Sequence, residues 1–153
     1  YINTTGRNDI VKSKVSRDNR FLYFYVECAE TLPSEKDPNW MMLLIDIDRD
    51  KSTGWYGYDY IVNRKHPTAR KVIVEKNVGN RWEWEEVTRS SYVVTNNRLE
   101  IKIERKQIGL EEKPVQIEFK WNDNMQENGT KLIGTNQSDT NTQQDEKTLF
   151  LLI

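Results

Sequence analysis

The chain has 153 residues, which is the length of one domain and enough to bury a hydrophobic core. Lys and Arg number 23 against 24 Asp and Glu, so the net charge of −1 gives no electrostatic reason to expect a nucleic acid or an anionic membrane as partner. No apolar run approaches the roughly 20 residues of a membrane helix, so we expect no membrane insertion. The chain begins with Tyr1 rather than Met, and we expect a fragment or a processed form.

Cys28 is the one cysteine and His66 the one histidine. A single cysteine excludes a disulfide within the chain and a thiolate-rich zinc site. Cys28 shares a predicted strand face with Phe24 and Val26, so we expect it in the core. His66 precedes a proline in a loop, where a solvated side chain is expected.

Alternation of apolar and polar residues runs through the chain and predicts short β-strands. Leu99, Ile101 and Ile103, for example, alternate with charged residues. The expected strands are residues 9–16, 21–28, 39–46, 58–64, 71–76, 82–87, 92–94, 98–104, 115–121 and 148–153. One short helical turn is expected over residues 105–110.

Many short strands without an amphipathic helix predict an all-β fold, an antiparallel β-sandwich of two packed sheets with a jelly-roll-like arrangement. We expect one domain over residues 1–153. Residues 134–147 are polar and nearly devoid of apolar anchors, and they are predicted to form a flexible surface loop.

The most informative stretch is residues 46–60, in which three aspartates at alternate positions precede a Thr-Gly turn and four aromatic residues. Oxygen ligands of this kind suit Ca²⁺. The run does not fit an EF-hand, because Lys51 replaces the required glycine, Gly57 replaces the final glutamate, and strands flank the loop.

An irregular calcium site formed by Asp46, Asp48 and Asp59 stays open. The alternative is that Asp46 and Asp48 cap turn amides or pair with a neighbouring cation, which could be Arg49, Lys51 or Arg64.

Five tryptophans are present, and a tryptophan in a strand is more often part of the core than of a ligand platform. Trp40 and Trp121 continue apolar strand faces, so a core position is expected for both. The alternative is a position in which the ring stacks on a ligand. Trp55 lies in a Gly-Trp-Tyr-Gly loop, where packing over the loop and stacking on a ligand are equal alternatives. The Asn122-Asp123-Asn124 sequence after Trp121 could bind sugar hydroxyls, or form a turn that ends the strand.

Motifs of nucleophilic catalysis and phosphate binding are absent from the sequence. Paired carboxylates such as Asp46 with Asp59, or Glu85 with Glu86, could in principle serve a glycosidase, which needs them about 5–10 Å apart in a cleft. The small size of the domain argues against an independent hydrolase.

Several segments together resemble carbohydrate-binding module family nine and the broader DOMON-like β-sandwich group. The segments are residues 21–28, the Leu-Leu-Ile-Asp-Ile-Asp run 43–48 with Ser-Thr-Gly-Trp 52–55 and Gly-Tyr-Asp 57–59, residues 99–104, and residues 117–124. The resemblance implies a secreted bacterial module, extracellular or periplasmic, that is joined to a glycoside hydrolase or a related polysaccharide-acting protein.

The resemblance also implies a sugar held between two tryptophans, and a structural calcium ion. Carried over to this chain, Trp55 and Trp121 would be the stacking pair. The polar sugar contacts would come from Asp59, Arg64, Asn122 and Asn124, and the calcium candidates are Asp46 and Asp48.

The first hypothesis is therefore a non-catalytic carbohydrate-binding module that takes a polysaccharide or oligosaccharide as ligand. The alternative is a structural accessory β-sandwich that packs against its parent catalytic domain and has no ligand of its own. The two hypotheses differ over Trp55, which should be exposed beside Trp121 in a binding module and buried in an accessory domain.

Overall fold

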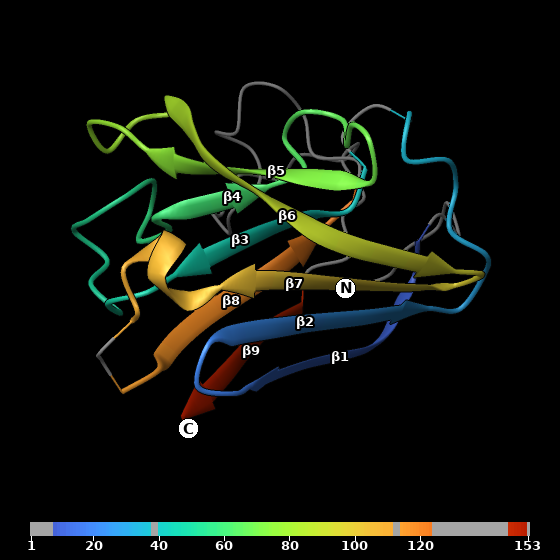
Figure 1. Cartoon of the computed structure of the whole chain (residues 1–153), viewed down its shortest axis with the longest axis horizontal. Helices are drawn as coiled ribbons and strands as arrows, with labels where there is room; N and C mark the ends of the chain where they lie inside the picture. The colour runs from blue at the N-terminus through green and yellow to red at the C-terminus, as the bar shows by residue number, and fades with distance from the viewer. Residues whose placement is uncertain (1–7, 38–39, 112–113, 124–146, 153) are drawn as a thin grey trace, which may run out of the picture.

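The computed structural model describes residues 8–37, 40–111, 114–123 and 147–152 (Figure 1). The elements are β1 Ile10–Arg17, β2 Phe21–Cys28, β3 Met42–Asp46, β4 Tyr60–Val62, β5 Lys71–Asn77, β6 Trp84–Thr95, β7 Arg98–Glu104, the 3₁₀ turn η1 Arg105–Ile108, β8 Gln116–Asn122 and β9 Lys147–Leu152. The predicted all-β, antiparallel architecture is confirmed. The loop predicted over 134–147 lies outside the described residues, apart from Lys147 at the start of β9.

The strands form one continuous antiparallel sheet in the order β1-β2-β7-β6-β5-β4-β3-β8-β9. The sheet curls until β1 comes close to β9, so its two halves face each other (Figure 1). The sequence predicted two packed sheets, whereas here the hydrogen-bonded ladder is unbroken. The predicted strands 82–87 and 92–94 are one long strand, β6, which continues through the polar residues between them.

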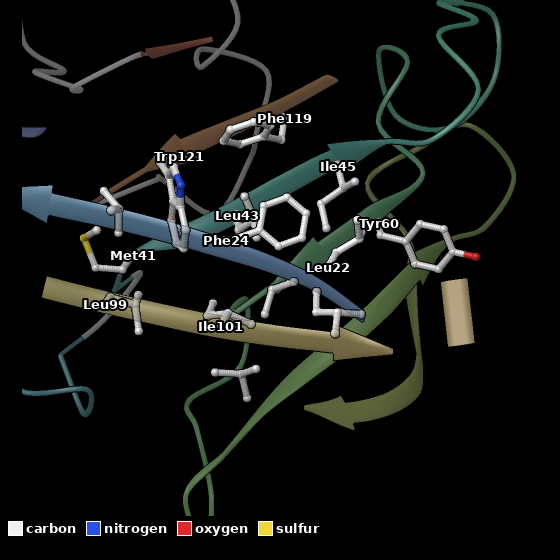
Figure 2. Packing of buried hydrophobic residues seen from close by; sticks show 14 of the residues in the cluster. Leu22, Phe24, Met41, Leu43, Ile45, Tyr60, Leu99, Ile101, Phe119 and Trp121 are labelled. Carbon is white, nitrogen blue, oxygen red and sulfur yellow. The ribbon is translucent and has the colours of Figure 1, made fainter. Parts of the chain in front are cut away.

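The main core fills the inside of the curl. Inward positions of β2, β7 and β8 alternate with outward ones, and the inward side chains are almost completely buried: Leu22, Phe24, Val26, Cys28, Leu99, Ile101, Ile103, Ile117, Phe119 and Trp121. Figure 2 shows Phe24 from one half of the sheet facing Phe119 from the other, with ring centroids 5.4 Å apart. Burying each side chain of this size stabilises the fold by roughly 1.5–3 kcal/mol. The core position predicted for Cys28 is confirmed.

A second, smaller cluster covers the opposite face of the sheet at β3 and β4. Leu43 and Ile45 point into the main core, while Met42 and Leu44, on the other face of β3, join this second cluster. Both faces of β3 are therefore buried, which explains why its sequence is apolar throughout. On the outer face this second cluster also contains Trp55, Tyr58 and Trp84, and Trp82 packs against it. The candidate site lies beside these aromatic residues.

Candidate functional site

Three aspartates meet where β3 ends. Asp46, Asp48 and Asp59 each offer a carboxylate oxygen, and these oxygens lie within 4.8 Å of one another. Asp46 is fully buried, Asp59 is half-buried and Asp48 is exposed. The backbone N–H of Asp59 donates to the carbonyl of Ile45 at 2.9 Å, and its side chain accepts the N–H of Ile47 at 2.9 Å, which brings the two ends of the loop together. The cluster could hold a metal ion, and its oxygen atoms do not specify which one.

Each aspartate of the run also caps a backbone amide in the loop, so the predicted turn-capping role is real. Asp46 Oδ1 accepts the N–H of Asp48 at 3.2 Å and of Arg49 at 2.6 Å. Asp48 Oδ1 accepts the N–H of Asp50 at 2.8 Å, and Asp50 Oδ1 accepts the N–H of Ser52 at 2.8 Å. The two-residue spacing of the aspartates thus matches the spacing of Asx-type turns.

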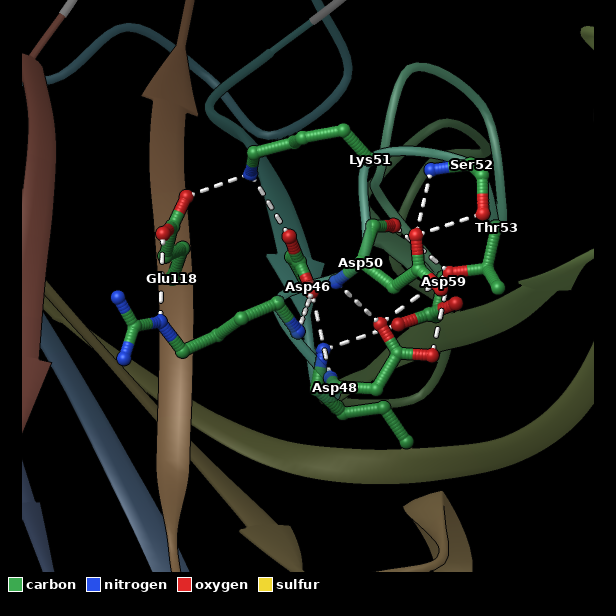
Figure 3. Close-up of polar contacts among 10 residues, drawn as sticks. Asp46, Asp48, Asp50, Lys51, Ser52, Thr53, Asp59 and Glu118 are labelled. Carbon is green, nitrogen blue, oxygen red and sulfur yellow. Dashed lines mark hydrogen bonds and ion pairs between the residues drawn. The ribbon is translucent and has the colours of Figure 1, made fainter.

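Lys51 supplies a cation to the buried end of the loop (Figure 3). Its ammonium lies 2.8 Å from Asp46 Oδ2 and 2.6 Å from Glu118 Oε2 in β8, while the Nε of Arg49 lies 3.5 Å from Glu118 Oε1. Desolvation opposes the charge on Lys51, but the bonds to Asp46 and Glu118 outweigh it and raise the pKa of Lys51 to about 12. The residue that breaks the EF-hand pattern therefore ties the loop to the sheet.

The carboxyl group of Asp59 is affected by burial and by the two neighbouring aspartates. Burial raises the pKa of Asp59, the N–H of Ile47 lowers it in part, and the negative charges of Asp48 and Asp46 raise it further. Carboxylates held this close repel one another, and a bound cation would relieve the repulsion.

Trp55 and Trp121 belong to different clusters, so the predicted stacking pair is not brought together. Trp121 is fully buried and faces the inside of the curl with Ile117 and Phe119, because all three occupy the same face of β8. Trp55 is 4% exposed and packs on the outer face. The core position considered for Trp121 is the one the structure shows.

The predicted polar contacts are also dispersed. Arg64 makes a two-pronged ion pair with the buried Glu75, at 2.9 Å from Nε and 2.6 Å from Nη2. Asn122 is buried and pairs with Met42, at the opposite end of β3 from Asp46. Asn124 lies outside the described residues. Of the predicted sugar contacts, Asp59 alone lies in the loop that carries Trp55, and there it joins the acidic cluster.

Three aromatic rings gather around Trp55. Its ring centroid lies 4.6 Å from that of Trp82, 5.1 Å from Tyr56 and 6.5 Å from Trp84, and all three contacts are tilted or edge-to-face. Trp82 is half-buried and Tyr56 is 52% exposed. Trp55 is therefore the floor of an aromatic cluster whose outer members meet solvent.

Beside this cluster the surface is hollowed into an open groove of about 470 Å³, which we call the aromatic groove. Its lining includes Ser52, Trp55, Tyr56, Asn80, Arg81 and Trp82. Asn80 Nδ2 donates to the carbonyl of Ser52 at 3.0 Å, which ties the β5–β6 hairpin to the loop after β3. Sequence reasoning missed Tyr56, Asn80, Arg81 and Trp82 as a group, although the Gly-Asn turn at 79–80, which Arg81 separates from Trp82, was a usable signal.

Comparison of the chain with protein-family models, with curated proteins and with solved structures found no match of any of the three kinds. The resemblance to carbohydrate-binding module family nine therefore stays a prediction. Within the described ranges, no helix has the length and apolar character needed to cross a membrane.

Proposed function

We propose that this chain is a non-catalytic carbohydrate-binding module whose ligand lies in the aromatic groove. The observation that carries the proposal is the combination of exposed aromatic surface on Tyr56 and Trp82 with the polar side chains of Ser52, Asn80 and Arg81 in one open hollow. Aromatic faces suit the C–H side of a sugar ring, and amide, hydroxyl and guanidinium groups suit its hydroxyls.

This proposal moves the sugar site away from the pair first predicted. Trp55 supports the groove from below, and Tyr56 and Trp82 take the role of the stacking rings. Tyr56 is 52% exposed, and its backbone has φ of 51°, in the strained left-handed region, where conformations of this kind are often found at binding sites.

A catalytic role has less support than binding. Asp46 is fully buried, and its carboxylate oxygen lies within 4.8 Å of one on Asp59, closer than the separation of about 5–10 Å at which glycosidase carboxylates face each other across a cleft.

Calcium is the metal we propose for Asp46, Asp48 and Asp59. Ca²⁺ accepts irregular arrangements of carboxylate and carbonyl oxygens, whereas Mg²⁺ demands near-ideal octahedral geometry. The ion would be structural, holding the loop that forms one wall of the groove.

Several further proposals rest on the sequence resemblance. They are a secreted bacterial origin, an extracellular or periplasmic location, attachment to a polysaccharide-acting enzyme, and a sandwich-like arrangement of the two halves of the sheet.

The accessory-domain hypothesis has one observation in its favour, since Trp55 is buried, as that hypothesis required. A glycan-binding screen separates the two hypotheses. The wild type is compared with Tyr56→Ala and Trp82→Ala, and with Tyr25→Ala as a matched control, because Tyr25 lies on the outer face of β2 and not among the groove residues.

Sugar binding predicts that at least one glycan binds, and that each groove variant weakens binding about tenfold or more, equivalent to about 1.4 kcal/mol, while Tyr25→Ala does not. Binding of no glycan would favour the accessory role. Binding that survives both groove substitutions would exclude this groove.

A further inference from the structure

Strand β6 changes its hydrogen-bonded partner at Ser91. Ser91 pairs with Lys71 of β5 on one side and with Lys102 of β7 on the other. From residue 84 to residue 90, β6 pairs with β5 and, among the described residues, with no strand on its other side. The strands β6 and β7 therefore diverge like the arms of a fork, as Figure 1 shows.

A hollow of about 270 Å³ lies at this fork. The lining residues whose side chains carry hydrogen-bond donors are Lys71, Arg89, Ser90, Ser91, Lys102 and Gln107. They come from β5, β6, β7 and η1, so donor groups reach the hollow from four separate elements. We call this hollow the fork site.

Positive charge at the fork site is not neutralised locally. Among the described residues, neither Lys71 nor Lys102 forms an ion pair. Lys71 Nζ donates to the hydroxyl of Ser91 at 2.7 Å, and Lys102 Nζ lies 3.8 Å from the ring centroid of Phe21. Both ammonium groups are therefore available to an anion in the hollow.

The other charged groups around the fork site do not cancel its excess of positive charge. Arg89 is paired with Glu86 at 2.7 Å, and the lining carboxylate, Glu104, is paired with Arg20 at 2.7 Å and Lys106 at 3.4 Å. The positive charge of Lys102 does reach one carboxylate beyond the hollow, that of Asp18.

Ser90 adds an independent observation. It lines the fork site, it is 4% exposed, and its hydroxyl has no hydrogen-bond partner among the described residues. Buried hydroxyls are nearly always bonded, so an acceptor that reached this one would satisfy a donor that is now unpaired.

We propose that the fork site binds a sulfate or phosphate group. Such a group offers several acceptor oxygens in different directions, which suits donors on Lys71, Lys102 and Gln107, three lining residues from three different elements. The hollow has room for one such group, which can be the free anion or an ester substituent on a saccharide.

The first test is an amide chemical-shift titration of the full chain with sodium sulfate against sodium chloride at equal ionic strength. The proposal expects saturable shifts at Ser90 and Ser91 with sulfate and none with chloride. Lys71→Gln and Lys102→Gln should each weaken the binding about tenfold, because each removes one charge-assisted contact.

Lys14→Gln is the matched control, since Lys14, like Lys102, lies against an aromatic ring, 5.8 Å from the centroid of Tyr25, but is not among the lining residues. Shifts that grow linearly, or that are the same in all four proteins, would overturn the proposal, because sulfate stabilises proteins generally by exclusion from their surface.

The second test identifies the source of the anion. Inorganic sulfate, a monosaccharide sulfate ester and the unsulfated sugar are titrated separately. Equal binding of the first two assigns the free anion, and tighter binding of the ester assigns a sulfated saccharide. If the unsulfated sugar shifts the same amides, the fork site does not recognise an anion.

Discussion

The ammonium of Lys51 bridges the buried carboxylate of Asp46, at 2.8 Å, and Glu118 Oε2, at 2.6 Å. Asp46 ends β3 and Glu118 lies in the neighbouring β8, so one loop side chain closes the loop onto two strands. The bridge holds the base of the loop, and a metal ion at Asp46, Asp48 and Asp59 would add a second link within the same loop.

Lys51→Met tests this bridge. The change leaves the carboxylate of Asp46 buried without its cation, and we expect a loss of about 1–2 kcal/mol in the free energy of unfolding. This expected loss is smaller than that for a fully buried ion pair, because the Lys51 side chain is 59% exposed. Urea denaturation measures it.

Lys12→Met is the control for Lys51→Met, because Lys12 pairs with Glu27 at 3.6 Å on the surface and should cost little. If both substitutions lower the free energy of unfolding equally, the bridge to Asp46 stabilises the fold no more than a surface ion pair does.

Calcium should raise the melting temperature of the wild type, because an ion that binds only the folded state stabilises it. Asp59→Asn should abolish that rise, since it removes one of the three carboxylates of the cluster. Asp9→Asn, at an exposed position outside the cluster, should leave it intact. A melting temperature that EDTA and Ca²⁺ leave unchanged in the wild type would remove the metal site.

Gly54→Ala should distort the loop that forms a wall of the aromatic groove. Gly54 has φ of +61°, and a Cβ there would lie 2.2 Å from the carbonyl oxygen of Tyr58. We expect a loss of stability of about 2–4 kcal/mol, from the strained backbone and the collision together.

Gly79→Ala separates the two causes, because Gly79 has φ of +71° but open space around the added atom. Its cost should be backbone strain alone, about 1–2 kcal/mol. Thermal unfolding of both variants checks the difference, and a Gly79→Ala variant as unstable as Gly54→Ala would contradict it.

Asp18 makes stability depend on pH in the acid range. A hydrogen bond from the hydroxyl of Tyr23, and then the amides of Phe21 and Arg20, lower the pKa of Asp18 below its ordinary value. The folded state thus prefers the charged carboxylate. Its contribution is complete above the ordinary pKa, about 3.9, and is lost as the pH falls through the lower folded value.

Melting curves of the wild type and Asp18→Ala from neutral to strongly acidic pH test this dependence. The wild type should be the more stable at neutral pH, and the difference should shrink as Asp18 becomes protonated. A difference that stays constant across the whole range would show that the carboxylate charge contributes nothing.

Trp121→Ala should destabilise the fold by about 3–5 kcal/mol, as expected for removal of a large core side chain. Tyr56→Ala, at a residue that is 52% exposed, should change stability by less than about 1 kcal/mol. Denaturant unfolding of both variants decides whether Trp121 is a core residue and Tyr56 a surface one.

Most strands could be predicted from the sequence because their apolar residues alternate with a period of two. The inward face of β8, with Ile117, Phe119 and Trp121, was visible in that alternation and already favoured a core position for Trp121. The continuity of β6 could not be predicted, since the polar residues between its halves are held in the strand by pairing with β5 and β7.

The acidic cluster was predicted because Asp46 and Asp48 stand at a strand end and Asp59 before the next strand. The aromatic groove was not, because it forms only when the β5–β6 hairpin, with Asn80 and Trp82, folds over the loop that carries Trp55. Such a contact between distant segments leaves no periodic pattern in the sequence.

The central claim, that sugar lies in the aromatic groove, is tested most directly by the tryptophan indole N–H signals during titration with a glycan identified in the screen. The account predicts saturable shifts for Trp82 and Trp55, and none for the buried Trp121. Shifts at Trp121 without shifts at Trp82 and Trp55, or no shift with any glycan, would contradict it.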